Sequence, residues 1–181
     1  TNQKWIDEYF LNGMKKAEPN AFSNLADQQV EVPAGEPSLS ESSTYVRFVG
    51  QNYNLATFAI QTYSYSAGAA HGMSHQEFVN FDLSNKKHIT VAELLKPEMN
   101  QKLRDELYAA NQNWLDDHQI KKDQLQVSDN FYYGVNGIVF VYPLYELASY
   151  AEGMSELTLP YYSAKKFIKA EYLPSLPKEP N

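Results

Sequence analysis

The dipeptide Asn136-Gly137 constrains the fold more than any other feature of this sequence. It separates two runs of strand-forming residues, 131–135 and 138–142, which are rich in aromatic and β-branched side chains. Asn and Gly both accept the positive φ angles that a type I′ turn requires. The pattern therefore predicts an antiparallel β-hairpin over residues 131–142.

A period of two in the large apolar side chains predicts further strands on both sides of this hairpin. The predicted strands are residues 45–49, 55–65, 75–83, 88–89 and 156–159. The first two flank a turn signal at residues 50–52 and are expected to form a second hairpin. Since short turns join most of these segments, we expect a mostly antiparallel sheet.

Helical periodicity marks the beginning, the centre and the end of the chain. Residues 1–17 are typical of an amphipathic helix. Thr90 and Glu93 match a capping box that opens a short helix. Two more helices are predicted, the longest over residues 97–117 and a short one over residues 161–169. The fold class is α+β: a mostly antiparallel sheet with a long central helix packed on it, an N-terminal amphipathic helix and a short C-terminal helix.

The length of 181 residues fits one domain with one core. Residues 1–44 are an N-terminal helix and an irregular lead-in that belong to the same domain, and residues 31–44 are predicted as a loop rich in Pro and Ser. Residues 45–168 form the α+β body. Residues 169–181 are a Pro-rich tail.

The composition and the absence of common motifs argue against several classes of function. The net charge is −7 and no extended Lys/Arg cluster occurs, which argues against nucleic acid and anionic lipid as partners. Without cysteine the chain has no disulfide, thiol catalyst or Cys-based zinc site. The longest strongly apolar stretch, residues 138–144, is too short to span a bilayer. No nucleophile-elbow, P-loop or dinucleotide motif is present, and no cofactor is predicted.

Two stretches of the sequence resemble a known family. The first combines residues 63–72, an aromatic strand followed by a Gly-Ala-Ala-His-Gly loop, with residues 81–95, a Phe-Asp-Leu strand leading into a helix. The second combines residues 137–153, which contain Pro-Leu-Tyr-Glu and end in Gly, with residues 157–161. Together they resemble the RsiV-like family of domains of unknown function, found in the lysozyme-sensing anti-sigma-V factor and at the C-terminus of the peptidoglycan deacetylase PdaC. The deacetylase motif itself is absent from this chain.

This resemblance implies an extracytoplasmic location, in the periplasm or on a membrane-anchored lipoprotein with a lipid anchor upstream of residue 1. It also implies a partner: lysozyme or another cell-wall hydrolase, or peptidoglycan. The family resemblance supplies these expectations, and composition does not.

Two loops carry the candidate contact residues. The first contains Gly68 and His71 and follows the strand residues Tyr63 and Tyr65. Small residues there allow a tight turn and a close approach to a partner. The second is the segment 143–153, and its candidate contact residues are Pro143, Tyr145, Glu146 and Tyr150. Tyrosines suit such a surface because the ring is apolar and its tip is polar.

Each candidate also has a structural interpretation. A lone histidine such as His71 more often ties its own loop together than binds a ligand, and His71 with His75 lacks the carboxylates that would complete a metal site. Most tyrosines in a Tyr-rich sheet pack in the core. Alternation along the strands predicts that one tyrosine of each pair, Tyr63/Tyr65 and Tyr132/Tyr133, is exposed.

Three functions are compatible with these residues. The favoured one is a non-catalytic binding domain of the bacterial cell envelope. The second is a hydrolase of cell-wall polymers that uses His71 with Glu146 or Glu152, since paired carboxylates cleave glycosides. The third is a structural or assembly domain. Neither a catalytic residue nor a metal site is assigned.

Overall fold

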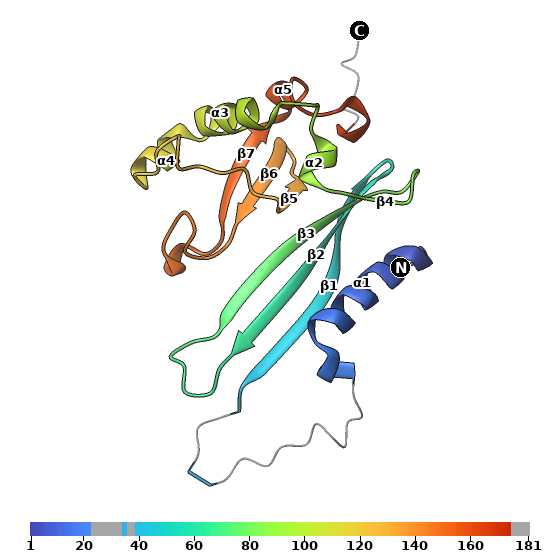
Figure 1. Ribbon diagram of the computed structural model, residues 1–181, viewed down its shortest axis with the longest axis vertical. Coiled ribbons are helices and arrows are strands. Elements are labelled where there is room, and N and C mark those ends of the chain that lie inside the picture. The colour runs from blue at the N-terminus through green and yellow to red at the C-terminus, as the bar shows by residue number, and fades with distance from the viewer. Residues whose placement is uncertain (23–33, 36–38, 175–181) are drawn as a thin grey trace. The chain divides into compact units, whose positions relative to one another are not determined.

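The computed structural model describes residues 1–22, 34–35 and 39–174. They form an α+β fold with two antiparallel sheets, as the sequence predicts (Figure 1). The chain divides into two compact units. Unit 1 comprises Thr1–Val46 and Gln61–Ser74, and unit 2 comprises Arg47–Ile60 and His75–Asn181. The predicted domain limits near residues 45 and 168 stay predictions.

The first sheet has four strands in the order β1-β2-β3-β4. They are β1 (Glu41–Asn52), β2 (Leu55–Tyr65), β3 (Met73–Asp82) and β4 (Lys87–Ile89). This confirms the predicted hairpin of the first two strands. The strand β1 begins earlier than predicted, inside the expected loop 31–44, of which residues 31–33 and 36–38 lie outside the described part. Its polar start is tolerated because β1 is an edge strand, exposed along most of its length.

The second sheet has three strands in the order β5-β6-β7. They are β5 (Phe131–Tyr133), β6 (Gly137–Tyr142) and β7 (Ser155–Pro160). The central strand β6 is buried on both faces. One face joins a large apolar cluster that includes Ile138, Phe140, Tyr142, Leu103 and Leu107. The other face joins a smaller cluster made of Val139, Val141, Ala59 and Phe78.

The hairpin over residues 131–142 is confirmed, but its turn is not of type I′. Neither Asn136 nor Gly137 has a positive φ angle. Residues 134–136 form a longer connection, in which the Gly134 amide donates to the Gly137 carbonyl at 2.9 Å. Gly137 is required for a different reason. A Cβ atom at this position would collide with the Leu159 carbonyl on β7, so only glycine lets the two strands approach this closely.

The helices follow the predicted order with altered limits. They are α1 (Lys4–Ala17), η1 (Pro19–Phe22), α2 (Val91–Leu94), α3 (Asn100–Ala110), α4 (Gln112–Asp117), η3 (Tyr150–Glu152), α5 (Tyr161–Ala164) and η4 (Ala170–Tyr172). The N-terminal helix is confirmed. The capping box is also confirmed: the Glu93 amide donates to the Thr90 hydroxyl, and the Thr90 amide donates to the Glu93 carboxylate. None of the helices in these described ranges is long and apolar enough to cross a membrane.

The predicted long helix over residues 97–117 is wrong in two respects. It begins only at Asn100, and it is broken at Asn111 into α3 and α4. The Asn111 side chain explains the break. Its Nδ2 donates to the carbonyls of Leu107 and Thr158 at 2.7 and 3.0 Å, and its Oδ1 accepts from the Thr158 amide at 3.0 Å. Asn111 therefore binds the outer edge of β7, on the side away from β6.

The predicted C-terminal helix over residues 161–169 is too long. The helix α5 ends at Ala164, and Ile168 forms an antiparallel bridge with Leu95. The Lys96 amide donates to the Phe167 carbonyl at 2.8 Å, and the Lys169 amide donates to the Leu94 carbonyl at 3.0 Å. These distant partners hold Ile168 and Lys169 in an extended segment where local periodicity favours a helix.

Asp82, the acidic residue of the Phe-Asp-Leu strand, holds the turn between β3 and β4. It is 1% exposed. Its carboxylate accepts from the side chains of Asn54 and Asn85 at 3.0 and 2.7 Å and from the Ser84 amide at 2.9 Å. Burial alone raises the pKa of Asp82, but these hydrogen bonds outweigh it and lower the pKa overall. Asp82 is therefore an ionised structural anchor.

Candidate functional site

The segment 143–153, which we name the aromatic loop, joins β6 to β7 in unit 2 (Figure 1). Both strands that carry it are fixed at the junctions. Tyr142 is buried at the end of β6 and donates its hydroxyl to the Gln126 carbonyl at 2.7 Å. Ser155 is buried at the start of β7. The loop therefore leaves and re-enters a rigid sheet.

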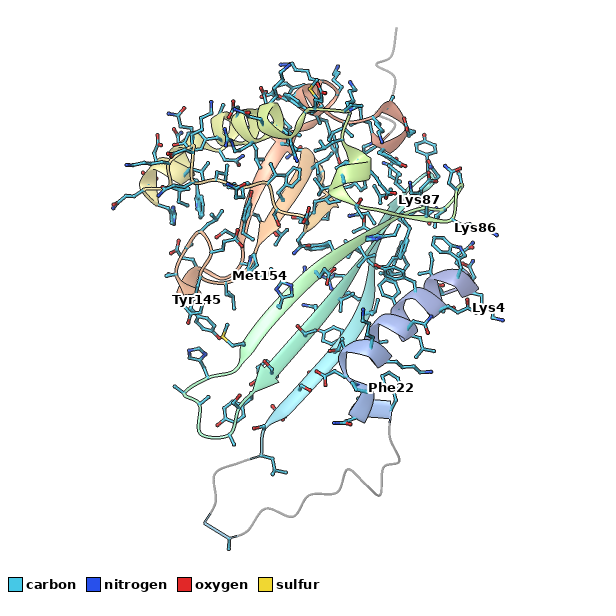
Figure 2. The ribbon with its side chains drawn as sticks, in the orientation of Figure 1. Lys4, Phe22, Lys86, Lys87, Tyr145 and Met154 are labelled. Atoms are coloured by element: carbon cyan, nitrogen blue, oxygen red, sulfur yellow. The ribbon has the colours of Figure 1, made fainter. Side chains whose placement is uncertain are left out.

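Two tyrosines on the aromatic loop stack against each other. The rings of Tyr145 and Tyr150 are 5.7 Å apart, with 29° between their planes. Both are solvent-accessible, with 58% of Tyr145 and 36% of Tyr150 exposed. Figure 2 shows Tyr145 at the outer end of the loop. The backbone of Tyr145 has a φ of 69°, an uncommon conformation for a residue with a bulky side chain. The predicted residues Pro143 and Glu146 lie next to this pair, where the Glu146 amide donates to the Pro143 carbonyl at 3.2 Å.

A capping box shapes the second half of the aromatic loop. The Ser149 hydroxyl donates to Oε1 of Glu152 at 2.8 Å, and the Ser149 amide donates to the same oxygen at 3.3 Å. The Glu152 amide donates to the Ser149 carbonyl at 3.1 Å. Gly153 follows with a φ of 80° and ends the turn. The spacing Ser-x-x-Glu was a readable sequence signal for this turn.

An ion pair connects the aromatic loop to α4. Oε2 of Glu152 lies 2.6 Å from Nε2 of His118, and Nδ1 of His118 lies 2.8 Å from the Trp114 carbonyl. The imidazole also stacks on the Trp114 indole, with ring centroids 3.9 Å apart. Sequence reasoning missed His118, because 34 residues separate it from Glu152. No local spacing could have indicated the contact.

The electrostatics of the pair are reciprocal. The hydrogen bond that His118 donates to the Glu152 carboxylate, followed by the one that it donates to the Trp114 carbonyl, raises the pKa of His118 above its ordinary 6.5. The hydrogen bond from His118, followed by that from Ser149, lowers the pKa of Glu152 below its ordinary 4.5. Both side chains are therefore stabilised in their charged forms. We call this ion pair, which holds the aromatic loop to the end of α4, the clip.

This arrangement does not form a catalytic triad. In a serine hydrolase the serine hydroxyl faces the imidazole, whereas here the Ser149 hydroxyl faces the carboxylate and both imidazole nitrogens have other partners. A glycosidase acid needs a raised pKa, but the pKa of Glu152 is lowered. The contacts of Glu152 thus favour a structural role over the role of a general acid.

The second candidate loop, residues 66–72, lies in unit 1 and joins β2 to β3. The Ala69 amide donates to the Ser66 carbonyl at 2.9 Å, and Gly68 has a φ of 82°. This is the geometry of a type II turn, which favours glycine at its third position. The Ala67 amide donates to the Ser40 hydroxyl at 2.9 Å. The predicted tight turn at Gly68 is confirmed.

His71 is exposed in this loop, and its Nδ1 lies 3.0 Å from the carbonyl of its neighbour Gly72. Gly72 itself packs under the ring of Tyr63, where any Cβ atom would overlap the ring. Tyr63 is 37% exposed and Tyr65 is half-buried. Within the ranges that the structure describes, no cluster of three or more His, Asp or Glu residues suits a metal ion.

The structure brings Tyr145 and Tyr150 together on one loop and places Tyr63 against Gly72 on the other. The two loops belong to different units, so their union into a single contact surface stays a prediction. The prediction that either Tyr132 or Tyr133 is exposed is wrong. Both are partly buried, because each face of their sheet packs on its own apolar cluster.

Comparisons with known proteins agree with this fold. Residues 82–162 match the family described as a protein of unknown function, DUF3298. The crystal structure of a DUF3298 family protein from Pseudomonas aeruginosa PAO1 is similar with a TM-score of 0.63 and 22% identity, over 76% of this chain and 65% of that protein. A DUF3298 member from Bacteroides fragilis NCTC 9343 gives a TM-score of 0.63 and 21% identity, over 92% of this chain and 69% of that protein.

At these identities the two structures establish the fold and no activity. This chain spans 65% of the length of the Pseudomonas protein and 69% of the length of the Bacteroides protein. No curated protein matches the chain. The family match over residues 82–162 and the fold shared with the two DUF3298 structures agree with each other.

Proposed function

We propose that the chain is a non-catalytic binding domain of the bacterial cell envelope, periplasmic or part of a lipoprotein, which recognises lysozyme or a similar basic cell-wall hydrolase. The observation that carries this proposal is the stacked, exposed pair Tyr145–Tyr150 on a loop clipped to α4. The envelope location and the class of partner come from the resemblance to the RsiV-like family.

The geometry of the aromatic loop suits a protein partner. Tyrosines supply a large amphipathic contact area at low conformational cost, and they often dominate the energy of an interface. The mutual stacking of Tyr145 and Tyr150 and the pair His118–Glu152 restrict the loop before any partner binds. Such preorganisation strengthens binding because less freedom is lost on association.

Charge supports a basic partner. The chain has a net charge of −7, so a positively charged protein is attracted to it over several ångströms. This attraction increases the association rate more than the lifetime of the complex, and salt screens it. Binding to a basic hydrolase should therefore weaken as ionic strength rises.

The test is a calorimetric titration of the purified chain with lysozyme and, separately, with soluble peptidoglycan fragments. The double variant Tyr145→Ala/Tyr150→Ala removes the stacked pair, and Tyr162→Ala, which removes an exposed tyrosine elsewhere in unit 2, is the matched control. We expect the double variant to weaken lysozyme binding by at least about tenfold, because truncation of a small binding hot spot has an effect of this size. The control should bind normally.

The same mixtures are assayed for release of peptidoglycan fragments. Binding of lysozyme without release supports the proposal. Binding of peptidoglycan fragments alone would replace the protein partner by a glycan. Release of fragments by the chain alone would establish the hydrolase alternative, and His71, Glu146 and Glu152 would then be the first residues to replace. No interaction with any of these molecules would overturn the proposal.

A further inference from the structure

Lysine side chains gather where two segments of unit 2 meet, although the chain as a whole is acidic. The segment after β3 and the segment after β7 are joined by the antiparallel bridge between Leu95 and Ile168. Together, residues 86–98 and 161–172 contain six lysines and three glutamates, whereas the whole chain has 15 Lys and Arg against 22 Asp and Glu. We name these lysines the lysine patch: Lys86, Lys87, Lys96, Lys165, Lys166 and Lys169.

The side chain of Lys96 ties the two segments together. Its Nζ donates to the Lys165 carbonyl at 2.7 Å and to the Lys166 carbonyl at 3.3 Å, across 69 and 70 residues of sequence. Three lysines that are remote in the sequence are thereby neighbours in the fold. The absence of a long basic run in the sequence therefore does not exclude an anionic partner at this place.

Tyr172 connects Lys169 with the lysines of the β3–β4 turn. Nζ of Lys169 lies 6.0 Å from the centre of the Tyr172 ring. The pKa of Lys87 is raised by its hydrogen bond to Glu93 and, to a smaller extent, by the nearby Tyr172 phenol. Lys86 precedes Lys87 at this turn (Figure 2). All six lysines therefore belong to one region of unit 2.

Most charges of the lysine patch are not neutralised within the chain. Lys87 forms an ion pair with Glu93. The other ammonium groups of the patch form no ion pair with any carboxylate of the described residues. Lys165 and Lys166 are also exposed to solvent. Since salt screens charges beyond about 8 Å at physiological ionic strength, acidic residues farther away do little to cancel this local positive charge.

An exposed aromatic side chain accompanies the lysines. Tyr162 on α5 is 73% exposed. It precedes Lys165 and Lys166 by three and four residues, the spacing that places side chains on one side of a helical turn. Tyrosine and lysine together are typical of the membrane interface, where the ring lies among the lipid headgroups and the ammonium groups attract anionic lipid. Tyr162 therefore favours a lipid surface over a soluble polyanion, which the lysines alone would bind.

We infer that the lysine patch binds the headgroups of anionic phospholipids and, together with Tyr162, holds this part of unit 2 against a membrane surface. The inference is independent of the proposed function, because the lysine patch and the aromatic loop share no residue. Either can fail while the other stands.

The test is co-sedimentation of the purified chain with vesicles made of equal parts of phosphatidylglycerol and phosphatidylcholine. Vesicles of phosphatidylcholine alone are the control for charge. We expect binding to the anionic vesicles only, and it should weaken as ionic strength rises. Inorganic phosphate and soluble polyphosphate are titrated separately by calorimetry, and we expect both to bind more weakly than the anionic vesicles.

A triple variant removes half of the charges of the lysine patch. In Lys165→Gln/Lys166→Gln/Lys169→Gln the loss of three lysines should weaken binding to the anionic vesicles by at least about tenfold, because each lysine near an anionic surface contributes about a fivefold change in affinity. The melting temperature should change little, since none of these ammonium groups has a carboxylate partner among the described residues.

The matched control is Lys102→Gln/Lys121→Gln/Lys122→Gln. It removes three exposed lysines from another part of unit 2 and changes the net charge by the same amount. This control should bind anionic vesicles within about twofold of the parent chain, because its lysines lie outside the patch.

Tyr162→Ala separates a membrane from a polymer. This variant keeps every charge of the lysine patch, so any binding of polyphosphate should be unchanged. Binding to the anionic vesicles should weaken, because the ring that enters the headgroup layer is lost.

The inference is overturned if the chain does not sediment with anionic vesicles, or if it binds phosphatidylcholine equally well. It is also overturned if the two triple variants lose the same affinity, since net charge rather than the patch would then explain binding. Binding of polyphosphate as tight as that of the vesicles, or unchanged vesicle binding by Tyr162→Ala, would replace the membrane by a soluble polyanion.

Discussion

The two units of the chain differ most in how much apolar surface they bury. Among the described residues of unit 1, only Ile6 and Phe10 of α1 are buried apolar side chains. Unit 2 contains both apolar clusters and the doubly buried strand β6. The same contrast holds for the loops. Residues 66–72 contain a tight turn and a hydrogen bond from the Ala67 amide to the Ser40 hydroxyl, whereas the aromatic loop forms an ion pair with His118.

In unit 2, both the buried core and the ion pair of the aromatic loop join residues that lie far apart in the sequence. The family match also lies within unit 2. The core that defines the fold and the ion pair that holds the aromatic loop are therefore parts of the same unit. Replacements of single residues can test how far this contrast extends.

The largest effect is expected from truncation of the core. Phe140→Ala in β6 should lower the free energy of unfolding by about 3–5 kcal/mol, the usual cost of such a cavity. Phe10→Ala in α1 should cost about 2 kcal/mol, because Phe10 is slightly more exposed than the fully buried Phe140. Denaturant titration measures both values. Hydrogen exchange then shows where protection is lost: if Phe10→Ala also exposes the amides of β6, the two units unfold together and the contrast between them fails.

A smaller loss is expected at Gly72 in unit 1. Gly72→Ala forces the Tyr63 ring away and should cost about 1–2 kcal/mol, a typical penalty for overpacking. The matched control is Gly13→Ala in α1, where added atoms meet no neighbour, and it should stabilise the helix by up to about 1 kcal/mol. If thermal melting shows that Gly72→Ala is as stable as the parent chain, the packing of the Tyr63 ring on residue 72 does not contribute to stability.

Protection of the aromatic loop against hydrogen exchange should decrease both at high pH and at low pH. The pKa of His118 is raised, so its contribution is complete below about pH 6.5 and is lost as pH rises through the raised pKa. The pKa of Glu152 is lowered, so its contribution is complete above about pH 4.5 and is lost as pH falls through the lowered pKa. Amides of residues 143–153, corrected for intrinsic exchange rates, should be best protected between these limits.

The variant His118→Gln removes the positive charge of the pair and should abolish the loss of protection at high pH. The carboxylate of Asp117 also favours the charged imidazole, so Asp117→Asn is a second control and should shift the upper limit to lower pH without removing it. A profile of the same shape in His118→Gln would mean that other groups hold the loop.

The smallest effect is expected from His71→Ala. The histidine is exposed and contacts its neighbour's carbonyl, so we expect a change below about 0.5 kcal/mol in the free energy of unfolding. A loss of lysozyme binding with unchanged melting would instead identify His71 as a contact residue.

Sequence reasoning succeeded where structure depends on neighbours along the chain. The Thr90–Glu93 capping box and the turn at Gly68 are set within four residues. Sequence reasoning failed where a group far away in the sequence determines the local structure. Asn111 breaks a helix because Thr158 offers it a strand edge, and Gly137 is needed for the Leu159 carbonyl rather than for a positive φ. The His118–Glu152 pair was missed for the same reason.

The bond between Asn111 and Thr158 also has a consequence for solubility. An open strand edge offers its amides and carbonyls to any extended chain, which is how many proteins begin to form fibrils. Here one carboxamide occupies both the amide and the carbonyl of Thr158 and so imitates a neighbouring strand one residue long. The edge of the second sheet is thereby closed to other copies of the chain at this point, and the broken helix is the structural cost of that protection.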